Sequence, residues 1–404
     1  MVQLHLVLFT PQNVILSIKH YLVLSLQVDH FIDPIWFVLS HKKQVFGEMP
    51  SLPFHQGFAG QSVRCNPWIP SQFIITAADN FGVTGSGKVY LVEWLPDHPP
   101  NAPMKVIGCF GTSDGAFDAC FSEMDPNIIA VACGDGVKLY NIQSAFNCDG
   151  AMPLVAPHDH QGEVVCAAWN QVSKDSFYTS SWDGTVRVWG ALQPQTAAMV
   201  LQGHMKEVYE VSPAPRDAHL LLSCSGDGFW KLWDVRKGPQ AVIGAPGHNN
   251  QIILSIDWNK YDPNCFLTGG VDQLVKLWDI RRPQQEAMVL RGHQGPVRRV
   301  RCSPHARTQV ASSGYDYRVA MWDLGRPQRP LTHRYEQHKE FVVGLDWSLI
   351  APGCVVSAAW DGFAFFQQAG LPPTHSPPCP LAPALPPPRG PGNRRRGQGG
   401  PMAR

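Results

Sequence analysis

Five histidines in this chain each precede an aspartate by 23 or 24 residues, a spacing that could bring the two side chains together. The pairs are His160 and Asp183, His204 and Asp227, His248 and Asp272, His293 and Asp316, and His338 and Asp361. A carboxylate can orient an imidazole for acid–base catalysis, or the two can join loops through a charge-assisted hydrogen bond. Five equal pairs favour the structural role, because one protein has no use for five identical active sites. No Gly-rich phosphate loop, nucleophile elbow or metal-ligand cluster supports an enzyme.

A repeat of 44 or 45 residues carries these pairs. The turn aspartates follow one another at that interval, and in four copies a Trp stands six residues later, at positions 189, 233, 278 and 322. After each His comes a short apolar alternation such as Val208-Tyr209-Glu210-Val211. Period-2 alternation bounded by turn residues predicts short strands. One period therefore holds about four strands, which is typical of one blade of a WD-repeat propeller.

Two weaker copies lie upstream of the five clear ones, over residues 54–94 and 114–140. Seven copies predict an all-β, seven-bladed WD-repeat β-propeller over residues 54–368, since closing a ring removes exposed strand edges. We expect blades three to six to be the most regular. The last blade is expected to be the least regular, because Gln367 stands where its Trp should be.

Two flanks fall outside the repeat. Residues 1–53 are expected to form an extension outside the propeller. This extension is either poorly ordered or the result of a start codon placed too far upstream in the gene model, and Met49 is a second candidate start. Pro and charged residues interrupt their apolar runs, so no membrane span is expected. Residues 369–404 are rich in Pro, Gly and Arg and predict a disordered tail; a proline-rich docking peptide and a basic nuclear-import patch are the alternatives. Lys43–Phe46 is a candidate strand for closing the seventh blade.

Composition narrows the function further. The formal net charge is +1, so nucleic-acid binding by bulk electrostatics is not expected. The eleven Cys include no Cys-x-x-Cys pair and are interpreted as reduced, small hydrophobic residues of a cytosolic-type protein, with Cys120, Cys133, Cys166, Cys265 and Cys354 in strand-like runs. No metal site, cofactor or prosthetic group is implied.

Segments between the repeat motifs are more specific than the motifs themselves. They include the turn at residues 80–85 (Asn-Phe-Gly-Val-Thr-Gly), the element at residues 114–118 (Asp-Gly-Ala-Phe-Asp) and the strand at residues 297–300 (Val-Arg-Arg-Val). With these segments, residues 54–366 resemble the peroxin-7 family, cytosolic receptors for the type-2 peroxisomal targeting signal. A WD-repeat adaptor of another class, histone-binding or serving a ubiquitin ligase, is the alternative.

The resemblance implies a binding protein, not an enzyme. Its ligand would be a nine-residue amphipathic helix, Arg-Leu-x5-His-Leu, near the N-terminus of cargo such as thiolase. Its partners would be a co-receptor peroxin and the peroxisomal docking complex, with no nucleic acid and no direct membrane insertion. It would work in the cytoplasm and shuttle to the peroxisome.

A propeller would receive such a helix over its central channel. Glu163 and Glu207 are the expected partners of the signal's Arg, with Asp114 and Asp118 in reserve. Aromatic residues expected to cover its Leu side chains are Trp182, Tyr209, Tyr315 and Trp360. Phe117 and Leu254 are further candidates, although they also fit a core role, and the two Glu also fit a solvated rim.

Overall fold

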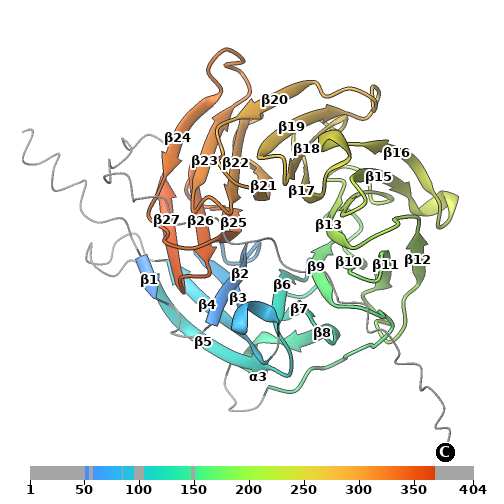
Figure 1. Ribbon diagram of the computed structural model, residues 1–404. Coiled ribbons are helices and arrows are strands. Elements are labelled where there is room, and N and C mark those ends of the chain that lie inside the picture. Colours follow the sequence, from blue (N-terminus) through green and yellow to red (C-terminus); the bar gives the residue numbers. More distant parts are fainter. Residues whose placement is uncertain (1–50, 54–57, 84, 95–103, 147–150, 369–404) are drawn as a thin grey trace, which may run out of the picture. The chain divides into compact units, whose positions relative to one another are not determined.

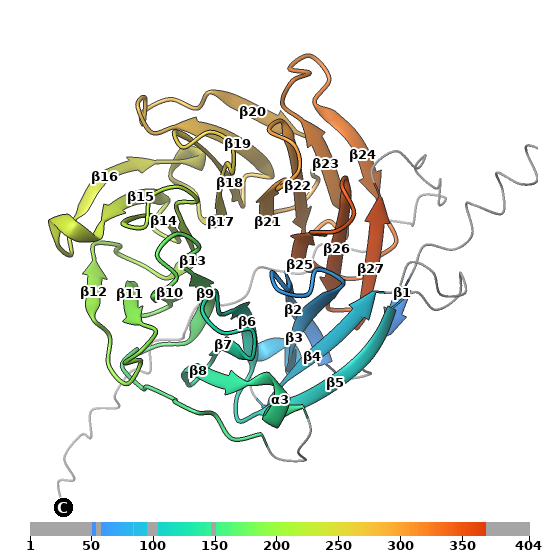
Figure 2. The ribbon, with the colours of Figure 1, turned by 180° about the vertical axis from the view of Figure 1, so that it is seen from behind.

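The structure is a computed structural model, and it describes residues 51–53, 58–83, 85–94, 104–146 and 151–368. They form seven antiparallel sheets arranged as blades around a ring (Figures 1 and 2). The predicted seven-bladed propeller is therefore confirmed. No helix in this part of the chain is long and apolar enough to span a membrane.

Each blade runs from an inner strand at the channel to an outer strand at the rim. Blade one holds β2 (Phe58–Cys65), β3 (Gln72–Asp79), β4 (Gly87–Trp94) and β5 (Met104–Thr112). Blade two holds β6 (Ala116–Phe121), β7 (Ile128–Cys133) and β8 (Gly136–Asn141), and blade three β9 (Val164–Trp169), β10 (Ser176–Ser181), β11 (Thr185–Gly190) and β12 (Met199–Gln202). Blade four holds β13 (Val208–Pro213), β14 (Leu220–Ser225), β15 (Phe229–Asp234) and β16 (Ala241–Pro246).

The remaining blades follow the same order. Blade five holds β17 (Ile253–Trp258), β18 (Cys265–Gly270), β19 (Leu274–Asp279) and β20 (Met288–Arg291). Blade six holds β21 (Val297–Cys302), β22 (Gln309–Gly314), β23 (Val319–Asp323) and β24 (Leu331–Tyr335). Blade seven holds β25 (Val342–Trp347), β26 (Cys354–Ala359), β27 (Phe363–Gln368) and β1 (Ser51–Pro53). The short helices are η1 (Asn80–Gly82), α3 (Ile142–Ala145), η2 (Val235–Lys237) and η3 (His248–Asn250).

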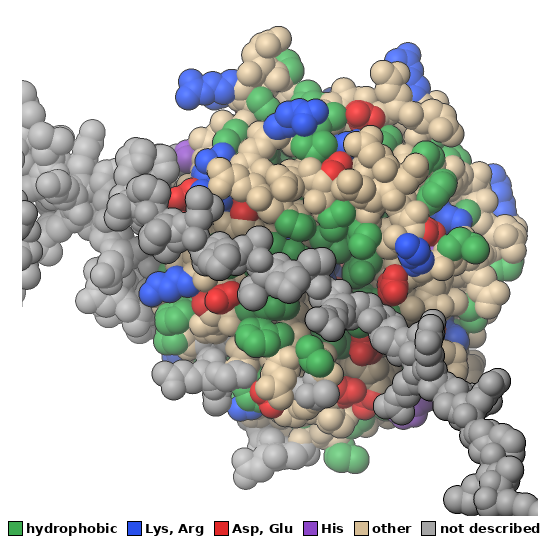
Figure 3. Space-filling view, in the orientation of Figure 1, with side chains coloured by type: hydrophobic (Ala, Val, Ile, Leu, Met, Phe, Trp, Pro, Cys, Tyr) green, Lys and Arg blue, Asp and Glu red, His purple; other side chains and the backbone are tan. Residues whose placement is uncertain are grey.

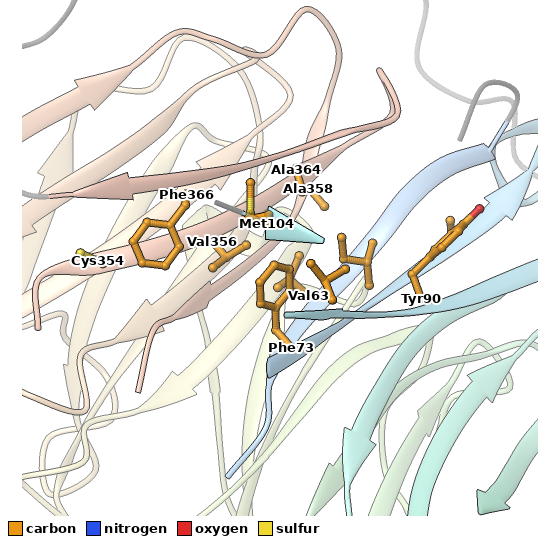
Figure 4. Packing of buried hydrophobic residues seen from close by; sticks show 12 residues of the cluster. Val63, Phe73, Tyr90, Met104, Cys354, Val356, Ala358, Ala364 and Phe366 are labelled. Carbon is orange, nitrogen blue, oxygen red and sulfur yellow. The ribbon is translucent and has the colours of Figure 1, made fainter. Parts of the chain in front are cut away.

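The strand that closes the ring comes from the N-terminal side of the propeller. β1 pairs with β27, with Leu52 opposite Ala364, so the boundary expected at residue 54 is three residues too late. The alternative closing strand, Lys43–Phe46, lies outside the described residues. Figure 4 shows the core at this seam, where Val63 and Phe73 of blade one lie beside Val356 of blade seven.

Blade two, not blade seven, is the least complete blade, so the expectation that the last blade would be the least regular was wrong. Its sheet has three strands, and β8 is extended only by an isolated bridge between Leu139 and Val155. Blade seven gains its fourth strand from β1, which compensates for its irregular sequence. Blades three to six have four strands each, as expected.

Each of the seven inner strands carries one extra residue near its start. In blade four Val208 pairs with Ser225 and Glu210 with Cys224, which leaves Tyr209 unpaired in the ladder. The same shift leaves Phe117 unpaired in blade two. It also leaves Leu254 unpaired in blade five and Arg298 in blade six. Such a bulge re-aims a side chain without ending the strand.

Candidate functional site

The five His–Asp pairs lie on one face of the ring, here called the upper face. The Nδ1 to Oδ distances are 2.8 Å (His160–Asp183), 2.9 Å (His204–Asp227), 2.6 Å (His248–Asp272), 3.0 Å (His293–Asp316) and 3.0 Å (His338–Asp361). Each pair joins the loop before an inner strand to the turn between the second and third strands. The repeat spacing therefore brings together the side chains that it suggested.

A hydroxyl group completes each pair and was missed by the sequence analysis. In blade four the Oγ of Ser223 lies 2.8 Å from Nε2 of His204 and accepts a hydrogen bond from Nε1 of Trp233 at 2.8 Å. The equivalent residues are Thr179, Thr268, Ser312 and Ser357. All five stand four residues before the turn Asp, a regularity that could have identified them.

These contacts leave the histidines no free nitrogen for catalysis. The hydroxyl accepts from Trp and so donates its own hydrogen to Nε2, which leaves Nδ1–H to donate to the Asp. Burial lowers the pKa of His248, although Asp272 opposes the shift. Burial alone would raise the pKa of Asp227, but hydrogen bonds from His204 and backbone N–H groups lower it to about 2. Such a pair is a neutral imidazole hydrogen-bonded to an ionised carboxylate, and its role is structural. We call each His–Asp pair with its hydroxyl partner a latch.

Blades two and seven depart from this arrangement in different ways. In blade seven His338 keeps its contacts with Asp361 and Ser357, while the buried Gln367 in the Trp position contacts Gln337 at 3.3 Å. In blade two there is no His, and Lys138 lies 2.6 Å from Asp135 instead. The latch is thus most complete in blades three to six.

On the upper face, Asp114, Phe117 and Glu163 line a hollow, and the rings of Tyr315, Phe341, Trp360 and Phe81 contact one another in that order. Glu207 lies beside Tyr209, whose electrostatic surroundings also include Tyr315. We call the surface formed by these nine residues the upper bowl. In Figure 3 hydrophobic side chains gather near the middle of this face, and acidic ones lie beside them on the side of β6 to β9. The bowl therefore has an aromatic side and an acidic side.

The aromatic side is a chain of touching rings from three neighbouring blades. Tyr315 and Phe341 have ring centroids 4.6 Å apart, Phe341 and Trp360 5.1 Å, and Trp360 and Phe81 5.0 Å. Phe81 was not among the predicted site residues. It lies in η1 with a positive φ of 60° and is 55% exposed, so it is held outward by a turn that the sequence singled out only as a family motif.

The acidic side surrounds a hollow of about 500 Å³ lined by Asp114, Phe117, Glu163 and the turn after η1. Gly82 lets this turn approach Phe117, because a Cβ there would lie 2.5 Å from Cε1 of the ring. Burial and then the charge of Asp114 raise the pKa of Glu163. Its Oε2 is buried and has no hydrogen-bond partner among the described residues. This carboxylate is therefore poised to accept from a cationic ligand.

Glu207 and Tyr209 connect the two sides. Burial and then the neighbouring Glu207 raise the pKa of Tyr209 to about 12, and Arg298 and Tyr315 also lie within its electrostatic surroundings. Trp182 is 45% exposed on the upper face, and its backbone N–H donates to the carbonyl of Glu163. These residues surround one surface, as their spacing in the repeat suggested.

Two predicted site residues do not reach the bowl surface. Asp118 is fully buried in the channel, where its Oδ2 lies 2.6 Å from Arg64 and 3.8 Å from Arg299. Burial would raise its pKa, but these two cations hold it well below its usual range. Asp118 is therefore removed from the candidates for a ligand's Arg. Leu254 is 5% exposed, which fits the alternative core role.

Groups of three or more His, Cys, Asp and Glu side chains placed to hold a metal ion are absent from the described ranges. The nine cysteines in those ranges are free thiols. Burial raises the pKa of Cys133 and of Cys166 to about 12, so these thiols are protonated at neutral pH. The upper bowl offers apolar contact and the unpaired carboxylate oxygen of Glu163, which suit a short amphipathic segment with a basic residue.

Comparisons with known proteins agree with this architecture. The family model described as "WD domain, G-beta repeat" matches residues 153–190, 195–234, 240–279 and 284–323. The chain is 30% identical over 382 residues to the peroxisomal targeting signal 2 receptor of Saccharomyces cerevisiae, covering 78% of this chain and 98% of the relative. It is 36% identical to peroxisome biogenesis protein 7 of Arabidopsis thaliana (80% and 99%) and 32% identical to the peroxisomal targeting signal 2 receptor of Mus musculus (76% and 92%).

Proposed function

The chain belongs to the family of peroxisomal targeting signal 2 receptors, and we propose that it is a cytosolic receptor that binds this signal on cargo enzymes through the upper bowl. The signal is the amphipathic helix Arg-Leu-x5-His-Leu that the resemblance implies. The observation that carries this proposal is the buried Oε2 of Glu163, which has no hydrogen-bond partner among the described residues and lies in a hollow that Phe117 also lines.

The signal's Arg would enter the hollow between blades one, two and three. There the buried Oε2 of Glu163 would accept a charge-assisted hydrogen bond, and Asp114 would add a second negative charge. Guanidinium groups suit this role, because their planar donors match a carboxylate. Glu207 lies on the adjacent blade and is the second candidate partner for the same cation.

The apolar side of the helix would lie across the aromatic side of the bowl. Tyr315, Phe341, Trp360 and Phe81 form a continuous surface long enough to contact side chains on successive helical turns. Large rings bury much area with little loss of side-chain entropy, and such residues usually dominate interface energetics. Leu residues of the signal would therefore supply most of the apolar contact.

We further propose that the protein is not an enzyme and that it carries cargo such as thiolase to the peroxisome with a co-receptor peroxin and the docking complex, then returns to the cytoplasm. Support comes from family membership. It also comes from the histidine latches, whose nitrogens are already engaged.

Fluorescence anisotropy with a labelled Arg-Leu-x5-His-Leu peptide and a scrambled control tests the proposal. Glu163→Gln should weaken binding by about 10- to 100-fold, since a hydrogen bond to a charged group contributes about 1.5–3 kcal/mol. Glu123→Gln is a matched control, because burial also raises the pKa of this half-buried acid, which lies on the opposite face. Equal affinity for both peptides, or an unchanged affinity of Glu163→Gln, would refute the proposed site.

A further inference from the structure

One position of the repeat, directly before the turn Asp, changes its residue from blade to blade. In blades three to seven it is occupied by Trp182, Gly226, Val271, Tyr315 and Trp360. Blade two has Gly134 there, directly before Asp135. Gly134 lines the hollow of the upper bowl together with Asp114 and Glu163. The hollow therefore adjoins a position at which blade two carries no side chain.

The carboxylate of Asp114 packs directly against Gly134. A Cβ at Gly134 would lie 2.7 Å from Oδ2, 2.8 Å from Cγ and 3.0 Å from Oδ1 of Asp114. Any side chain at this position would therefore displace the carboxylate, and glycine is the residue that permits so close an approach. In its present place Oδ1 of Asp114 accepts a hydrogen bond from the backbone N–H of Gly115 at 2.7 Å. The bare position thus lets Asp114 stay at the wall of the hollow.

The charges around the hollow are not balanced. Asp114 and Glu163 line it, and the described residues of the lining include no Lys, Arg or His. Lys138 donates to Oγ of Ser113, which also lines the hollow, but its Nζ lies 2.6 Å from Asp135 as well. The positive charge of Lys138 is thus matched by that of Asp135. Two carboxylates of the lining remain to attract the cation of a ligand.

We propose that Gly134 is a specificity-determining residue of the upper bowl, and that it sets how long a basic side chain the hollow accepts. This inference rests on the proposed function and assigns the reach of its cation-binding part. Because position 134 has no side chain, Asp114 stays back and leaves length for an extended Arg side chain to reach Glu163. A side chain at position 134 would push the carboxylate of Asp114 into the hollow and shorten it.

Gly226 occupies the equivalent position in blade four and offers a direct comparison. A Cβ at Gly226 would lie 2.9 Å from Oε2 of Glu207 and 3.4 Å from Cε2 of Tyr209. A substitution there would therefore displace Glu207, the second candidate partner of the signal's Arg, and would leave Asp114 in place. The two glycines thus report on different carboxylates, so the pair tells which of them the cation of the ligand meets.

Fluorescence anisotropy with two signal peptides tests the proposal on the full chain. One peptide carries Arg, and the other carries norarginine, whose side chain has the same guanidinium on a stem one methylene group shorter. Gly134→Ala should weaken the Arg peptide at least about tenfold and the norarginine peptide much less, so the ratio of the two affinities should fall at least about fivefold. Gly226→Ala should leave this ratio unchanged. Gly190→Ala is the matched control, because an added Cβ there meets no atom within 4 Å.

A double variant tests whether Asp114 transmits the effect. In an Asp114→Ala background the displaced carboxylate is absent, so adding Gly134→Ala should change the ratio by less than about twofold. The ratio compares two ligands on the same protein sample, so partial unfolding of a variant cannot produce the expected change.

The outcomes separate this inference from the proposed function. If the Arg peptide still binds better than its scrambled control but Gly134→Ala leaves the ratio unchanged, Gly134 does not set the reach and the inference is overturned alone. A change of ratio in Gly226→Ala instead, or a full effect of Gly134→Ala without Asp114, would overturn it as well. If the unmodified chain does not distinguish the signal from the scrambled peptide, the proposed function fails and this inference fails with it.

Discussion

Replacing Asp272 by Ala should destabilise the propeller while leaving every side chain of the upper bowl in place. Oδ1 of Asp272 lies 2.6 Å from Nδ1 of His248 and 3.2 Å from the backbone nitrogen of Leu274. His248 is fully buried, so its N–H would lose its acceptor with no access to water. An unsatisfied buried donor costs about 1–3 kcal/mol. With two donors affected, the free energy of unfolding should fall by about 3 kcal/mol.

Thermal unfolding followed by circular dichroism measures this loss. The entropy of unfolding is about 2.1 cal/mol/K per residue, so in a propeller of roughly 320 residues a change of 1 kcal/mol shifts Tm by about 1.5 °C, and we expect a decrease of about 4–5 °C. Glu286→Ala is the control in the same blade. Its carboxylate lies 3.9 Å from Nζ of Lys276 and its side chain is 38% exposed, and such a pair contributes less than about 1 kcal/mol.

The same variant also tests whether the contact between Asp272 and His248 is structural or takes part in ligand binding. If Asp272 is structural, affinity for the signal peptide measured well below the new Tm should stay close to that of the unmodified chain. Loss of peptide binding at an unchanged Tm would refute the structural role. A Tm decrease no larger than that of Glu286→Ala would show that the contact contributes little.

Three further predictions concern pH, ring closure and the bowl. Burial lowers the pKa of latch histidines such as His248. As pH falls below about 6.5 these imidazoles are therefore protonated in the unfolded chain before they are protonated in the folded one, and Tm should decrease. A Tm that stays constant down to about pH 5 would contradict this. Leu52→Asp should weaken the packing between β1 and β27 and lower the free energy of unfolding by about 2 kcal/mol. The measurement is amide hydrogen exchange, which should become faster in β27 than in β19. Phe81→Ala should weaken signal-peptide binding about tenfold at constant Tm, whereas Leu192→Ala should change neither.

The repeat predicted the architecture because its period and turn chemistry are local properties. The spacing of His and Asp places both on one face of each blade, and the structure has the five pairs at 2.6–3.0 Å. Ring closure was less predictable. β1 is three residues long and pairs with residues 363–365, a contact between the two ends of the propeller that no local pattern encodes.

The site was predicted only in part, for a similar physical reason. Asp118 was expected, with Asp114, as a reserve partner for the signal's Arg; in the structure it follows the bulge residue Phe117. Yet the residue after a bulge faces the channel, where Arg64 and Arg299 from two other blades neutralise it. Phe81 was not predicted as a site residue because its outward position depends on its own positive φ within η1. Both outcomes depend on backbone geometry or on charges from distant blades, which single-residue patterns do not reveal.

The division between constant and variable positions explains how one repeated fold can present a single asymmetric surface. His, Ser or Thr, Asp and Trp recur at fixed positions in blades three to six and engage one another, so they contribute the same contact to each blade. The bulge position holds Phe117, Tyr209, Leu254 and Arg298 in different blades. Only such variable positions can give one sector of the bowl a different charge or shape from the next. Specificity for a ligand must therefore come from residues at which the blades differ, and stability from those at which they agree.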